Sequence, residues 1–165
     1  MSLVAGRTVT PAADDVPDTD DGGEKINAGS FWPEIALRNI RVEMRINGAV
    51  TTSRLKHAAI EALAHVVEQL TTWQAHQKEA GFAHLDEVPA TAINGESIKV
   101  IRFRRAVYSL TRALLIENYR DVDSTGDAGE KHAAGLTLQA ADLWRDVRWA
   151  IADIQGNVRS LAEVF

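Results

Sequence analysis

The residues best suited to chemistry are His57, Glu61 and His65, which recur every fourth position. In a helix this spacing puts them on one face, and imidazole and carboxylate groups are good ligands for zinc or iron. That face lies opposite the apolar stripe of Leu63 and Leu70, so it would meet water, with no further groups to orient the ligands. We therefore interpret it as the polar outer face of a helix. A metal-dependent helical-bundle enzyme is the weaker alternative.

Other common catalytic arrangements are absent from the sequence. The chain has no cysteine, which excludes disulfides, thiolate metal sites and cysteine nucleophiles. It contains no glycine-rich phosphate loop, no Ser–His–Asp signature and no paired-carboxylate motif. We expect no cofactor and no enzymatic activity.

A second candidate site is a row of arginines, Arg102, Arg105 and Arg112, along one flank of an expected helix. Such a row can follow a phosphate backbone, so these are candidate DNA-facing residues. The alternative is pairing with acidic residues of the neighbouring helices, since most clustered charges are solvated or paired. Arg104 falls within the apolar stripe of this helix, and we expect it to reach the surface or to find a buried partner.

Arg38, Arg41 and Arg45 form a similar row on an expected short helix. This row could meet a partner or DNA, or the helix could simply cover the bundle, which is the commoner arrangement. Overall charge does not indicate general nucleic-acid binding, because the chain beyond residue 29 carries 16 basic and 17 acidic residues.

Trp149 is the most informative single residue. On its helix it falls about 160° from the centre of the apolar stripe, among acidic residues, and Leu138 shares this outer side. An outward tryptophan with an apolar neighbour suggests an interface, because tryptophan is enriched at binding hot spots. The alternative is partial cover by a loop or by the C-terminal tail. Trp32 is a further candidate for a subunit or partner interface.

Helical periodicity dominates the sequence and predicts an all-α fold. We expect a small bundle of three long helices and one short N-terminal helix, over residues 34–46, 51–81, 94–120 and 132–155. Asn94 is the expected N-cap of the third helix. The segments 82–93 and 121–131 are expected loops, and no strand-rich region is visible.

The chain divides into three expected parts. Residues 1–29 carry two basic and six acidic residues, a net charge of −4, and no aromatic residue, which is typical of a disordered segment. Residues 30–156 form the expected helical domain, and residues 157–165 an extended C-terminal tail. The candidate docking residues of this tail are Val158, Arg159, Leu161, Val164 and Phe165.

No apolar run approaches the length of a membrane span. The N-terminus also lacks the basic-then-apolar layout of a secretory signal. These features predict a soluble, cytosolic product.

Several segments of the sequence resemble one known family. They are residues 86–90 (DEVPA), 94–97 (NGES), 105–107 (RAV), 117–120 (ENYR), 143–150 (LWRDVRWA) and 154–156 (IQG). The chain is similar, over about residues 31–165, to the head completion (head stabilisation, protein L type) family of phages with contractile tails. The block 143–150 is the most specific. Where family members often have a proline before the arginine that follows the last helix, this chain has Val158, before Arg159.

This resemblance implies a structural adaptor without catalytic chemistry. Family membership would place many copies in a ring at the portal vertex, stabilising the DNA-filled head and providing a docking surface for head–tail joining. The implied partners are the portal protein, neighbouring copies, and a downstream head–tail joining or tail terminator protein. Weak, sequence-independent contact with packaged DNA is also expected. The expected location is the virion, with the host cytoplasm during assembly. A soluble DNA-binding regulator is the alternative function.

Overall fold

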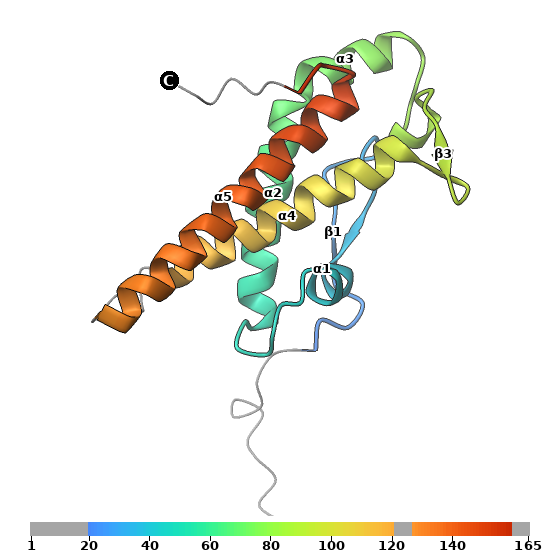
Figure 1. Cartoon of the computed structure of the whole chain (residues 1–165). Helices are drawn as coiled ribbons and strands as arrows, with labels where there is room; N and C mark the ends of the chain where they lie inside the picture. Colours follow the sequence, from blue (N-terminus) through green and yellow to red (C-terminus); the bar gives the residue numbers. More distant parts are fainter. Residues whose placement is uncertain (1–19, 121–126, 160–165) are drawn as a thin grey trace, which may run out of the picture.

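The structure, a computed structural model, describes residues 20–120 and 127–159 and is predominantly helical there (Figure 1). The broad expectation of an all-α fold is confirmed, with two short strand pairs added to the helices. The elements in chain order are β1 (Lys25–Ile26), β2 (Ile35–Ala36), α1 (Leu37–Glu43), α2 (Thr52–Gln69), α3 (Thr71–Glu79), the 3-10 turn η2 (Leu85–Glu87), β3 (Ala92–Ile93), β4 (Glu96–Ser97), α4 (Ile98–Arg120) and α5 (Asp127–Gln155).

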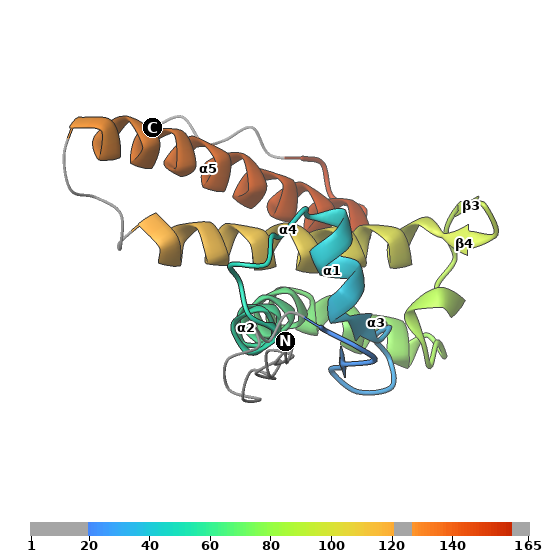
Figure 2. The same ribbon diagram turned by 90° about the horizontal axis from the view of Figure 1, so that it is seen from below.

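The long helix α4 is the centre of the molecule. It packs lengthwise against α5 on one side and crosses α2 on the other (Figure 2). Phe103, Val107 and Leu110 of α4 are completely buried, because their spacing puts them on one helical face. The two neighbours contribute Val66 and Val147 to the same core. Burial of this apolar surface is the main stabilising contribution to such a bundle.

Regular structure starts before Phe31, at β1, so the predicted boundary of the disordered segment at residue 29 is placed too far along the chain. β1 pairs antiparallel with β2, with Ile26 opposite Ile35, and Asp21 is fully buried. Two-residue strands carry too little alternation to be read from sequence. Residues 1–19 lie outside the described part of the chain.

The expected long helix over 51–81 is divided at Leu70 into α2 and α3. Leu70 leaves the helical conformation with ψ near 4° while its side chain stays fully buried. The Thr71 hydroxyl, just beyond it, donates to the Val67 carbonyl at 3.1 Å, and such back-bonding can bend a helix. The bend lets Trp73 reach Phe31, with their ring centroids 6.4 Å apart.

The expected helix start at Asn94 is wrong, because Asn94 and Gly95 form the turn of a β3–β4 hairpin. Both residues have positive φ, 50° and 76°, as a two-residue type I′ turn requires. Ala92 pairs with Ser97 and Ile93 with Glu96 across the hairpin. Helix α4 begins directly afterwards, at Ile98.

The remaining boundaries differ modestly from those expected. Helix α1 spans Leu37–Glu43 rather than 34–46, and α5 begins at Asp127 rather than near 132. Residues 157–159 follow α5 without regular structure, and 160–165 lie outside the described residues. Among the described helices, none is both long and apolar enough to cross a membrane.

Candidate functional site

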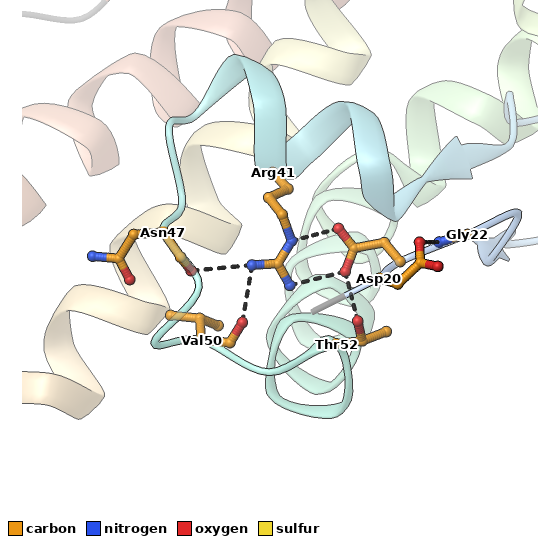
Figure 3. Close-up of polar contacts among 7 residues, drawn as sticks. Asp20, Gly22, Arg41, Asn47, Val50 and Thr52 are labelled. Carbon is orange, nitrogen blue, oxygen red and sulfur yellow. Dashed lines mark hydrogen bonds and ion pairs between the residues drawn. The ribbon is translucent and has the colours of Figure 1, made fainter. Parts of the chain in front are cut away.

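A buried ion pair between Asp21 and Arg41 ties the N-terminal segment to the bundle (Figure 3). Arg41 lies in the last turn of α1 and is 7% exposed, whereas Asp21 is fully buried. The guanidinium donates to both carboxylate oxygens, from Nε to Oδ2 and from Nη2 to Oδ1. The Thr52 hydroxyl, at the start of α2, donates to Oδ1 at 2.8 Å. Three elements therefore meet at one carboxylate.

The same guanidinium also holds the loop between α1 and α2. Its Nη1 donates to the carbonyl oxygens of Asn47 and Val50, at 3.1 and 2.9 Å. The expectation that Arg41 shares an outer basic face is therefore wrong, and only Arg38 and Arg45 of that row are exposed. The buried charge is tolerated because each of the three guanidinium nitrogens donates to at least one acceptor.

The hydrogen bond from Arg41 lowers the pKa of Asp21 below its ordinary value, although burial alone would raise it. The hydrogen bond from Thr52 acts in the same direction as Arg41. Asp21 therefore remains ionised at neutral and mildly acidic pH.

Val50 forms part of a surface groove at the end of the bundle where α2 begins. Two adjacent hollows, of about 510 and 230 Å³, share Val50 and Leu115 as lining residues. The first lies between the start of α2 and the second half of α4, and the second extends to the first half of α5. We call them together the bundle-end groove. Its lining includes Val50, Arg54, His57, Leu115, Asn118 and Leu136.

At the opposite end of α5, Trp149 and its neighbours form a compact cluster. The guanidinium groups of Arg145 and Arg159 lie over its ring, at 5.0 and 4.9 Å from the centroid. Arg159 also donates from Nε and Nη2 to the Asp153 carboxylate, at 3.0 and 2.6 Å. This hydrogen bonding lowers the pKa of Asp153. Trp149 is half-buried, with its cover coming partly from Arg159 of the C-terminal segment.

Leu138 lies on the same side of α5 as Trp149, about three turns and 16 Å nearer the helix start. It is 70% exposed, among the most exposed large apolar side chains that the structure describes. Trp32, by contrast, is 3% exposed and stacks on Phe103 at a centroid distance of 4.8 Å. Its expected interface role is therefore wrong, because its ring is part of the core.

Two of the three candidate DNA-facing arginines point toward acidic residues of α5. Arg102 lies 3.8 Å from Asp153, and Arg105 lies 3.3 Å from Asp146. Arg112 instead lines the bundle-end groove. The alternative to DNA contact, that these arginines pair with acidic residues of a neighbouring helix, therefore holds for Arg102 and Arg105. The side chains of both remain at least one-third exposed.

Of the two alternatives expected for Arg104, reaching the surface is the one observed, since the side chains of Arg104 and its partner Glu96 are 33% and 40% exposed. Arg104 pairs with Glu96 of the β3–β4 hairpin. This contact fastens the hairpin to α4.

The histidine stripe of α2 does not form a metal centre among the described residues. His57 and Glu61 are exposed, whereas His65 is half-buried and packs edge-on against Trp144 at 5.5 Å. Within residues 20–120 and 127–159, no group of three His, Asp or Glu side chains could hold a metal ion. The two histidines thus have different roles, since His57 lines the bundle-end groove.

Sequence reasoning missed the Asp21–Arg41 pair and the groove beside it. Asp21 is one of six acidic residues in the first 29, so nothing in composition distinguishes it from its solvated neighbours. Of the proposed tail residues, Val158 is 92% exposed and Arg159 is held by Asp153. Leu161, Val164 and Phe165 lie outside the described residues.

Comparison with known proteins gives a consistent result. The family described as phage head completion protein (GPL) matches residues 26–165. A relative, the head completion/stabilization protein of Escherichia phage P2, is 34% identical over 165 residues, covering 98% of this chain and 97% of the relative. No solved structure gives a significant match. The match spans the Asp153–Arg159 cluster and the bundle-end groove, and this chain belongs to the phage head completion protein family.

Proposed function

We propose that this chain completes the phage head as a structural subunit, joining the portal vertex in several copies to form a ring. The observation that carries the proposal is the nearly end-to-end similarity to a head completion/stabilization protein of phage P2. Family membership gives the coarser statement, a structural role in head completion and hence a place in the virion. Assembly of the ring in the host cytoplasm belongs to the proposal.

A ring subunit needs surfaces for its partners, and the outer side of α5 supports one of them. Leu138 is exposed there, and Trp149 shares that side under two guanidinium groups. Tryptophan and arginine are both enriched at binding hot spots. We assign this side to a partner such as the downstream head–tail joining or tail terminator protein.

The C-terminal segment is the proposed portal-docking element. Arg159 fixes its first residues by pairing with Asp153, so the chain leaves the bundle in a defined direction. An extended segment can then add to a partner's sheet edge or groove, with Val158, Leu161, Val164 and Phe165 as apolar anchors. Pre-organising the start of the segment lowers the entropic cost of docking.

Contact with packaged DNA is proposed to be weak and independent of sequence. Arg102 and Arg105 are partly neutralised by acidic residues of α5, and the folded part of the chain is nearly neutral overall. A channel that DNA must pass through is better served by weak phosphate contacts than by tight ones. The ion pairs of Arg102 and Arg105 also weaken the alternative of a DNA-binding regulator.

The proposed function is tested by DNA retention. Phage heads assembled without this protein are expected to package DNA and then lose it to added nuclease, whereas complemented heads protect it. Full DNA protection in heads that lack the protein would refute the proposal.

The docking element is tested separately by deleting residues 157–165. The variant is expected to keep its helical circular dichroism spectrum and to lose binding to purified portal rings. Arg159→Ala leaves the segment in place but removes its contact with Asp153. We expect this variant to bind portal rings more weakly than the wild type. Unchanged portal binding of the deletion variant would refute the assignment of the C-terminal segment as the portal-docking element.

A further inference from the structure

The molecule carries a small protruding hairpin with an exposed isoleucine, Ile93, at one end and an apolar groove at the other. The β3–β4 hairpin projects beyond the beginning of α4 (Figure 1). The bundle-end groove is lined by Leu115 and Asn118, in the second half of the same helix. Ile98, which begins α4, and Leu115, which lines the groove, are separated by about 25 Å along the helix. Because the rigid helix keeps them apart, a chain cannot place its hairpin in its own groove.

We propose that the hairpin of one copy inserts into the bundle-end groove of the next copy, forming a head-to-tail contact between identical chains. This inference deepens the ring arrangement proposed above and rests on it for the closure of the ring. The two surfaces differ, so the contact is heterologous, and repetition of it produces a ring if the rotation between copies closes.

The hairpin has the properties of an inserting element. Ile93, beside its turn, is 47% exposed although it is a large apolar residue. The two positive φ values of the turn fix its conformation, and the Ile98 amide donates to the Thr91 carbonyl at 2.9 Å, extending the ladder beyond the strands. Arg104 further fastens it through Glu96. A rigid projection loses little conformational entropy when it docks.

The groove offers a matching wall. Val50, Ala58 and Leu115 provide apolar lining in the larger hollow, and Leu136 provides it in the smaller one. Hollows of about 510 and 230 Å³ have room for an isoleucine side chain and the turn that carries it. The loop that contributes Val50 is held in place by Arg41, so the wall is preformed.

Charge at the two ends is complementary. Asp86 and Glu96 lie beside Gly95 around one hollow at the hairpin end. Arg104 pairs with Glu96, so Asp86 is the acid here that enters none of the ion pairs between described residues. The groove is bordered by Arg45, Arg54 and Arg112. None of the ion pairs between described residues involves these three arginines. Opposite charges at the two surfaces favour this orientation over head-to-head pairing.

The absence of cysteine from the chain allows a direct test by disulfide trapping. Ile93→Cys and Asn118→Cys proteins, each full length, are mixed and mildly oxidised. Asn118 is exposed and lines the larger hollow, and docking would bring the two thiols within bonding range. The matched control replaces Asn118→Cys with Val42→Cys, because Val42 is likewise exposed, at 60%, but is not among the residues that line the groove.

We expect the 93–118 heterodimer to form at least tenfold faster than the 93–42 heterodimer. Equal rates, or a predominance of 93–93 homodimers, would overturn the inference. Ile93→Lys places a cation against the arginines of the groove, so we expect it to reduce self-association at least tenfold, whereas Val42→Lys leaves it unchanged. Equal effects of the two lysine substitutions would also count against the hairpin.

The trapping is repeated with both cysteines in one chain, in complemented phage heads, to separate this inference from the proposed function. Covalently linked oligomers of this protein, joined by 93–118 disulfides in the heads, would support both the inference and the proposed function. Heads that retain DNA and contain the protein but no 93–118 linkage refute the inference and leave the proposed function standing. Absence of the protein from completed heads refutes the proposed function, whatever the purified chains do in solution.

Discussion

Replacing Asp21 with asparagine removes one charge from the buried ion pair with Arg41. Removing one partner of a buried pair costs about 3–5 kcal/mol, because the remaining charge is left without compensation. Arg41 retains two carbonyl acceptors, at 2.9 and 3.1 Å, and asparagine retains one oxygen. We therefore expect a loss near the lower limit, about 3 kcal/mol in the free energy of unfolding.

Urea denaturation followed by tryptophan fluorescence measures this loss. For a chain of 165 residues, it corresponds to a decrease in melting temperature of about 6–12 °C. Asp20→Asn is the matched control, because Asp20 is exposed and, among the described residues, accepts only the Gly22 amide at 3.1 Å. We expect the control to change stability by less than about 0.5 kcal/mol. A loss below about 1 kcal/mol for Asp21→Asn would refute the reasoning.

The pH dependence of the same comparison provides a second check. The lowered pKa of Asp21 means that its contribution is complete above the ordinary pKa of about 4. That contribution is lost as the pH falls through the lowered folded-state value. The stability difference between wild type and Asp21→Asn should therefore shrink on acidification below about pH 4. A difference that grows with acidity would contradict the assignment.

Three further predictions concern the core, the hairpin and the C-terminal cluster. Trp32→Ala should lower the free energy of unfolding, measured by urea denaturation, by about 3–5 kcal/mol because the ring is buried. Leu138→Ala should lower it by less than about 0.5 kcal/mol because that side chain is exposed. Similar losses for the two variants would contradict this placement. Gly95→Ala should lower stability by about 1 kcal/mol in thermal melts, because alanine is strained at positive φ, and an unchanged melting temperature would count against the turn. Arg159→Ala should return the pKa of Asp153 toward its ordinary value in a carboxyl NMR titration, and an unaltered titration would refute the contact.

The long helices could be predicted from the sequence because their packing faces repeat with the helical period. The stripe through Phe103, Val107 and Leu110 lies in α4, close to the expected range. Boundaries and interruptions were harder to predict. Leu70 continues the apolar pattern of α2 and yet ends that helix, because a bend allows Trp73 to reach Phe31. Such tertiary contacts override local propensity.

Long-range polar contacts could not be predicted for a different reason. Asp21 meets Arg41 and Thr52 across 20 and 31 residues of sequence, and no local spacing connects them. Trp32 and Trp149 show the same limit, since tryptophan suits a core and an interface equally well. Only the packing shows that Trp32 is internal and that Trp149 lies partly covered on the surface.

The most direct test of the account is electron microscopy of purified portal rings mixed with this protein. We expect a second ring of density attached to one end of each portal ring. Each subunit of that added ring should contact its neighbour and the portal. Portal rings that remain bare at protein concentrations sufficient to complement phage heads would contradict the central claim.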